Sequence, residues 1–199
     1  MTTKYPITVT LKGGETVELR PLQASDEQLL IEFFRDLPRE STEFLKDDVK
    51  DPAVVQRFVR QADPERVWAI VALAGGKVVG DATLHTDHVG WRRHVGEIRV
   101  VVASGFHKKR LATTMIHELV NQASSRELRK LEAQILDSQV HARTAFERLG
   151  FREEARLKDH AMDLDGRLHD LVIMTNTVDD LWRKMEDMIS DMEIARDGY

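Results

Sequence analysis

The chain has 199 residues, of which 42% are hydrophobic and 32% are charged, a composition that suits one globular domain with an ordinary core. It has no cysteine, which excludes disulfides, thiolate metal sites and a cysteine nucleophile. The formal net charge of −5 argues against general nucleic-acid binding and weakly favours cationic partners such as amines.

The N-terminal segment, MTTKYPITVTLKGG, lacks the apolar region of a signal peptide. No apolar run approaches the roughly 18 residues that a membrane span requires. We therefore expect a cytoplasmic protein that does not cross a membrane.

The polarity pattern predicts a hairpin, two helices and a second hairpin, followed by a strand, a helix, a strand, a helix, two strands and a last helix. In chain order these elements are expected at residues 7–22, 25–37, 51–63, 67–86, 96–102, 111–120, 131–137, 141–150, 153–163, 169–178 and 179–195. Ser25 and Gln28 have the spacing of a capping box, and Asp51-Pro52 is typical of a helix start. Gly150 ends the short helix before it.

This order predicts a mixed α/β (α+β) fold around one sheet. We expect one domain over residues 1–178, with residues 179–199 as a C-terminal helical appendage. The last predicted helix carries an apolar stripe at helical spacing, formed by Leu181, Met185, Met188, Met192 and Ala195. Such a stripe most often packs on its own domain, and a homodimer contact is the second hypothesis.

Four potentially basic residues, 107–110, stand between a predicted strand and a predicted helix. A helix N-terminus carries positive partial charge and unpaired N–H groups, so cations there are poorly placed unless an anion joins them. The alternative is a solvated charged face. The position after a strand favours a phosphate-like anion, although neither a P-loop nor a dinucleotide-binding motif is present.

Two segments, GEIRVVVASGFHKKRLATTMIHELV (96–120) and ARTAFERLGF (142–151), resemble the motifs of the GNAT superfamily of acyltransferases. The resemblance spans roughly residues 15–178 and implies a GNAT-like mixed sheet flanked by helices. It also implies an N-acetyltransferase that uses acetyl-CoA as co-substrate, without a metal, and an amine acceptor that is a small molecule or a protein lysine or N-terminus.

The resemblance places the family's pyrophosphate loop, Gln/Arg-x-x-Gly-x-Gly/Ala, at residues 107–112. The residues that it implies for cofactor binding are Val100, Val102, His107, Lys108, Lys109, Arg110, Leu111, Ala112, Thr113, Gln139 and Phe146. Arg110 stands where the family has its first glycine, so its Cβ could block the backbone or its guanidinium could bind phosphate. Phe146 stands where the family often has a proton-donating tyrosine. A non-catalytic acyl-CoA-binding or interaction module is therefore the alternative function.

Amine acetylation needs a base, because most amines are protonated at neutral pH. Glu97, where several family members carry a catalytic glutamate, is either this base or the partner of Arg99 or Arg93 in an ion pair. Strand alternation predicts that Glu97 and Arg99 share one face of their strand. The proton donors that could replace the missing tyrosine are histidines, each more often structural: His85, His94, His160 and His169.

Three further features concern ligands. Asp81 lies mid-strand and could hold a cationic acceptor or simply face water, and we favour the second. The acidic loop that holds Asp47 and Asp48 either favours an amine or is merely solvated. His85 and His88 point to opposite faces of a strand, so no metal site is expected there.

Overall fold

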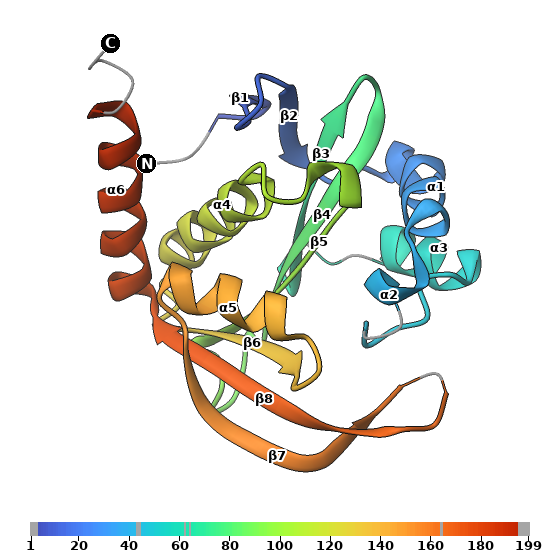
Figure 1. Cartoon of the computed structure of the whole chain (residues 1–199), viewed down its shortest axis with the longest axis vertical. Coiled ribbons are helices and arrows are strands. Elements are labelled where there is room, and N and C mark those ends of the chain that lie inside the picture. Colours follow the sequence, from blue (N-terminus) through green and yellow to red (C-terminus); the bar gives the residue numbers. More distant parts are fainter. Residues whose placement is uncertain (1–3, 43–44, 62, 64, 164, 195–199) are drawn as a thin grey trace.

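The computed structural model describes residues 4–42, 45–61, 63, 65–163 and 165–194. Within these residues the strands form one eight-stranded sheet in the order β1-β2-β3-β4-β5-β6-β8-β7 (Figure 1). The strands are β1 (Ile7–Thr10), β2 (Thr16–Pro21), β3 (Val67–Ala74), β4 (Lys77–Thr86), β5 (Val95–Val102), β6 (Lys130–Leu136), β7 (Arg152–Met162) and β8 (Leu168–Thr177). All neighbours are antiparallel except β5 and β6, which run parallel.

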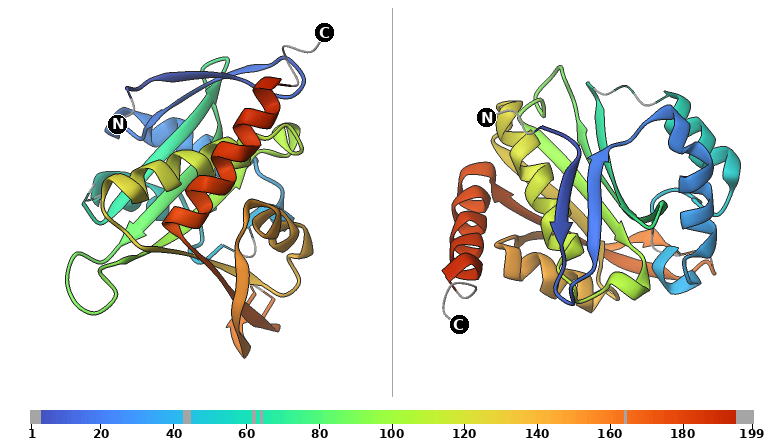
Figure 2. Two further views of the ribbon diagram at one scale, coloured as in Figure 1. Left: turned by 90° about the vertical axis from the view of Figure 1, so that its left-hand side faces the viewer. Right: turned by 90° about the horizontal axis from the view of Figure 1, so that it is seen from above.

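Helices cover both faces of this sheet, which confirms the predicted mixed α/β fold (Figures 1 and 2). They are α1 (Glu27–Asp36), α2 (Arg39–Thr42), α3 (Pro52–Gln61), α4 (Leu111–Ser125), α5 (Val140–Leu149) and α6 (Val178–Ile194), with 3-10 turns at Ala24–Asp26 and Ser104–Phe106. No helix within the described residues is both long and apolar enough to cross a bilayer.

Strand alternation divides the apolar side chains between two cores. Ile98 and Val102 of β5 pack in the larger core with α4, whereas Val101 borders the smaller core of α1 and α3. Because side chains of a strand alternate between its faces, Glu97 and Arg99 lie on the α1–α3 face with Val101, as the sequence predicts.

The start of α1 differs from the prediction. Ser25 and Gln28 do not form its capping box; instead the side chains and backbones of Gln23 and Asp26 cap the preceding turn reciprocally. Asp26 also accepts hydrogen bonds of 2.6 and 2.7 Å from Arg20. A partner six residues upstream in a strand thus decides which residue caps the turn.

The beginning of α6 packs on the body of the domain. Val178, Leu181 and Met185 are at most 2% exposed within the larger core. The Trp182 ring stacks on that of His117 of α4, with centroids 5.7 Å apart. The rest of the predicted stripe lies outside the described side chains, at Met188, Met192 and Ala195, so the homodimer contact stays a prediction.

Candidate active site

The parallel strands β5 and β6 separate in the middle of the sheet. Their register runs only from Val95 opposite Lys130 to Glu97 opposite Glu132, although β5 continues to Val102. Beyond Glu97 the backbone groups of β5 that point toward β6, in the stretch holding Val100 and Val102, therefore have no strand partner in the described chain. This opening offers an extended ligand a free strand edge.

The free edge leads directly to the start of α4. The backbone N–H of Thr114 donates to the carbonyl of Arg110 over 3.0 Å. Within the described residues, no backbone or side-chain acceptor bonds the N–H groups of Leu111, Ala112 or Thr113. Such unpaired N–H groups and the helix dipole favour an anion at this point.

Protein groups engage the side chains of His107 and Lys109, which belong to the basic segment before α4. His107 Nε2 lies 2.9 Å from the carbonyl oxygen of Val102. Lys109 forms an ion pair with Glu15, and its Nζ lies 5.2 Å from the centre of the Phe106 ring. The prediction of an anion site therefore rests on the backbone N–H groups and on the exposed Lys108.

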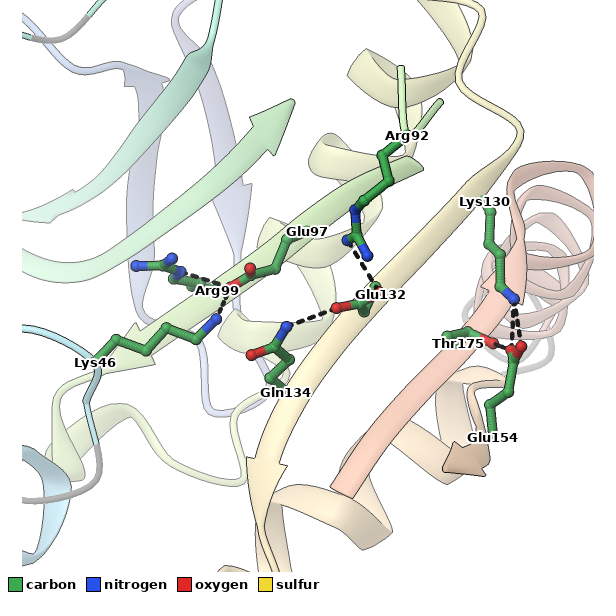
Figure 3. Close-up of polar contacts among 9 residues, drawn as sticks. All are labelled: Lys46, Arg92, Glu97, Arg99, Lys130, Glu132, Gln134, Glu154 and Thr175. Atoms are coloured by element: carbon green, nitrogen blue, oxygen red, sulfur yellow. Dashed lines mark hydrogen bonds and ion pairs between the residues drawn. The ribbon is translucent and has the colours of Figure 1, made fainter. Parts of the chain in front are cut away.

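Glu97 is held between two cations on the α1–α3 face (Figure 3). Its Oε1 accepts hydrogen bonds from Lys46 Nζ at 2.6 Å and Arg99 Nε at 2.8 Å, and Arg99 also reaches Asp47 at 3.5 Å. Burial raises the pKa of the Glu97 carboxyl, but the Lys46 hydrogen bond and the Arg99 charge outweigh it and hold the pKa below its ordinary value. The predicted ion pair with Arg99 is present, and Lys46 is an additional partner.

His85 lies directly opposite Glu97 in the β4–β5 register, whereas His94 lies elsewhere. His85 Nε2 is 3.0 Å from the Thr83 hydroxyl. Burial lowers the pKa of His85 to about 4, and the Arg99 charge acts in the same direction, so His85 is neutral at neutral pH. His94 is exposed and lines a different cavity, of about 840 Å³, beside Trp91.

A second cavity, of about 300 Å³, lies between β4–β5 and the helices α1 and α3. Asp81, Thr83 and His85 line it, as alternate residues of β4. Asp81 is only 8% exposed, and its Oδ1 has no hydrogen-bond partner among the described residues. Burial raises the pKa of Asp81 to about 7. The expectation that Asp81 faces water is wrong, because the two helices cover its face of the sheet.

Comparisons with known proteins identify the family of the chain. The family model described as the acetyltransferase (GNAT) family matches residues 29–151. The chain belongs to the GNAT family of acetyltransferases. A comparison of the sequence with curated proteins found no significant match.

Solved GNAT structures match most of the chain at low sequence identity. RimJ from Mycobacterium smegmatis, in complex with CoA-disulfide, has a TM-score of 0.74 and 18% identity, covering 92% of this chain and 93% of its own. Ribosomal-protein-alanine N-acetyltransferase from Brucella melitensis scores 0.70 at 23% identity, covering 80% and 98%. The putative acetyltransferase yncA from Salmonella typhimurium, with acetyl-CoA, scores 0.69 at 17% identity, covering 81% and 94%. These likenesses show the GNAT fold.

The segment predicted as the pyrophosphate loop, residues 107–112, has a glycine-like backbone although its sequence differs from the family's. Arg110, at the place of the family's first glycine, has φ of 70°, and Lys108 has φ of 60°. This left-handed region favours glycine, and other L-residues pay about 1–2 kcal/mol there. The backbone of residue 110 therefore follows the path that a glycine would take, at an energetic cost.

The second GNAT motif has no proton donor at the place of the family's tyrosine. Phe146 of α5 packs edge-on against Phe151, with ring centroids 5.1 Å apart. Gln139 Oε1 accepts a hydrogen bond of 3.0 Å from the Leu136 N–H, so this side chain secures the turn before α5. His169 of β8 is engaged with Asp163, its Nε2 lying 2.9 Å from Oδ2.

Sequence reasoning missed a polar pair on β6, Glu132 and Gln134, which begins beside Glu97 at the last paired position of β5 and β6 (Figure 3). Glu132 is the parallel partner of Glu97 and is 7% exposed. It accepts a hydrogen bond of 2.6 Å from Gln134 and lies 3.3 Å from Arg92. The signal was available in the strand sequence LEAQILD, where two polar residues alternate within an apolar run. Among the described residues, no group of three or more metal-ligating side chains comes together.

Proposed function

We propose that the chain is an N-acetyltransferase that transfers the acetyl group of acetyl-CoA to a primary amine of a small molecule or a protein. The observation that carries this proposal is the free edge of β5, which leads onto the unpaired N–H groups at the start of α4. A long ligand with an amide-bearing arm and a pyrophosphate matches this combination, because amides pair with a strand edge and phosphates bind helix N-termini. Family membership supports the same reading.

In this proposal the N–H groups of Leu111, Ala112 and Thr113, with Lys108, hold the pyrophosphate. The backbone of β5 around Val100 and Val102 pairs with the amides of the pantetheine arm. Acetyl-CoA supplies the thioester, whose carbonyl the amine nitrogen attacks, and the CoA thiolate leaves.

The amine must lose a proton, and Glu97 is the carboxylate proposed to accept it. Its lowered pKa keeps it ionised at neutral pH, but its bonds to Lys46 and Arg99 also make it a weak base. The neutral His85, opposite Glu97 in the register, is the second group proposed to handle this proton. Turnover and unfolding measurements on Glu97→Gln separate the role of general base from that of ion-pair residue. If Glu97 is the base, the variant loses turnover while its acetyl-CoA affinity is unchanged. If Glu97 is only an ion-pair residue, the variant loses mainly stability.

The proposed function is tested first by calorimetric titration of the protein with acetyl-CoA, with CoA as a control. We expect micromolar binding that weakens in Lys108→Gln. Lys109→Gln removes the same charge one residue away, but its side chain is already paired with Glu15. It should therefore weaken binding less. Absence of binding at millimolar acetyl-CoA would contradict the proposal.

The second candidate function, a non-catalytic acyl-CoA-binding module, is favoured by one observation, the phenylalanine at position 146. It predicts acetyl-CoA binding without turnover on any amine. Phe146→Tyr then provides a sharp comparison, because the tyrosine hydroxyl supplies the proton donor that the phenylalanine lacks. Turnover that appears only in this variant would support the second candidate for the wild-type chain.

A further inference from the structure

Asp81 is a carboxyl group at a position where the surrounding sheet is apolar. Its partners in the register are Val71 on β3 and Val101 on β5. Val71 is fully buried in the core formed with α1 and α3, and Val101 packs against the same core. An acid enclosed in this way costs stability unless it gains a partner, because a buried carboxylate loses its hydration.

Asp81 and His85, one of the two groups proposed to handle the proton, line the same cavity of about 300 Å³. Asp81 and His85 are four residues apart on one face of β4, which corresponds to about 13 Å along the strand. Asp81 lies at one end of this row, and at the other end His85 stands opposite Glu97. Apolar side chains of α1, α3 and the segment between them form the walls: Phe34, Leu45, Val49, Val54, Val55 and Phe58.

The other charged groups that line the cavity already have partners or lie at its exposed rim. Lys46 and Arg99 both bond Glu97, and Asp47 pairs with Arg99. Arg57 of α3 is exposed, and His85 is neutral at neutral pH. The titratable and charged groups that line the cavity with Asp81 are thus Lys46, Asp47, Arg57, His85 and Arg99.

We propose that this cavity binds the second cationic group of an alkyl diamine or polyamine acceptor, with the Asp81 carboxylate accepting a hydrogen bond from its ammonium. The apolar walls enclose the alkyl chain, and the other amine lies near Glu97 and His85. An ammonium paired with Asp81 keeps its proton and does not react, so the acetylated amine is the distant one. The inference rests on the proposed function in that it names the acceptor of the same site.

The test is calorimetric titration without acetyl-CoA, using α,ω-diaminoalkanes from diaminobutane to diaminooctane and the corresponding monoaminoalkanes. In the wild type we expect the best diamine to bind about tenfold or more tightly than its monoamine, as for a hydrogen bond between charged groups. This advantage should grow as the pH rises through about 7, because Asp81 then ionises. The wild-type comparison alone already tests the proposal, because equal binding of diamine and monoamine overturns it.

Asp81→Asn keeps the shape of the side chain and should abolish the diamine advantage. Asp87→Asn is the matched control, because it removes one negative charge from an exposed residue that lines the other cavity. It should keep the advantage, which separates recognition by Asp81 from general attraction to an acidic protein. An advantage that survives in Asp81→Asn refutes the assignment. Acetyl-CoA titration is measured separately, so a failure of the proposed function is distinguishable from a failure of this subsite.

Discussion

Arg110 allows the cost of a divergent loop to be measured directly. The residue has φ of 70° at the start of α4, where the family has glycine. We compare Arg110→Gly with Arg110→Ala rather than with the wild type. Both variants lack the guanidinium group, so its contacts cancel, and only the Cβ atom differs between them.

The expected difference follows from the backbone angle. An alanine in the left-handed region destabilises the folded chain by about 1–2 kcal/mol relative to glycine. Glycine has more conformational freedom in the unfolded chain, which offsets about 0.5–1 kcal/mol of this difference. Arg110→Gly should therefore have a free energy of unfolding about 0.5–1 kcal/mol above that of Arg110→Ala. For a chain of this size, this corresponds to roughly 1–4 °C in the melting temperature.

Urea unfolding of the two variants measures this difference. Ala112→Gly is the control, because residue 112 lies in the first turn of α4 and glycine there should lower stability by up to about 1 kcal/mol. The sign of the alanine–glycine contrast should thus reverse between positions 110 and 112. If Arg110→Ala is as stable as Arg110→Gly, the argument from backbone strain is refuted.

The same pair of variants decides how residue 110 affects the proposed CoA site. Tighter acetyl-CoA binding by Arg110→Gly than by Arg110→Ala means that the Cβ atom obstructs the approach of the pyrophosphate to the backbone. Equal losses in both variants, relative to the wild type, mean that the guanidinium contributes to binding.

Three further predictions concern stability. Asp26→Asn removes a buried carboxylate whose pKa Arg20 lowers, so the free energy of unfolding, measured in urea, should fall by about 3 kcal/mol. In the wild type this contribution is present above about pH 4 and is lost as the pH falls further. Leu181→Ala should lower the free energy of unfolding by about 2–5 kcal/mol because Leu181 is fully buried. Arg183 is exposed, so Arg183→Ala should change this free energy by less than about 0.5 kcal/mol. A small loss in both variants would show that α6 does not pack on the domain at Leu181. Burial lowers the pKa of His85 to about 4, so the unfolded chain binds more protons than the folded one between about pH 4 and 6.5. The free energy of unfolding therefore falls as the pH drops through this range. His85→Asn should remove up to about 3 kcal/mol of that fall, and an unchanged pH dependence in this variant would contradict the argument.

Features that depend on neighbouring residues could be predicted from the sequence. Asp51 begins α3 as expected, and its Oδ1 accepts a hydrogen bond of 2.9 Å from the Ala53 N–H. Gly150 ends α5 with φ of 107°, a backbone that glycine adopts without strain. Strand alternation correctly assigned Glu97 and Arg99 to one face, because the period of a strand is a local property.

Features that depend on distant residues could not be predicted in this way. Lys46 bonds Glu97 from 51 positions away, and Glu15 pairs with Lys109 from 94 positions away. Asp81 shows the same limit, since alternation says which face it occupies but not that α1 and α3 cover that face. The short helix α2, at residues 39–42, likewise had no periodic signal to reveal it.

These distant contacts change which carboxylate we expect to attract the proposed cationic acceptor. The sequence offered the acidic segment around Asp47 and Asp48 and, as the less favoured interpretation, Asp81. In the structure Asp47 pairs with Arg99, and Glu97 is bonded by both Lys46 and Arg99, so these two carboxylates are already compensated. Among the described residues that line the cavity, Asp81 is the buried carboxylate, and its Oδ1 has no hydrogen-bond partner. An ammonium therefore gains most at Asp81, because there it restores a hydrogen bond that no protein group supplies.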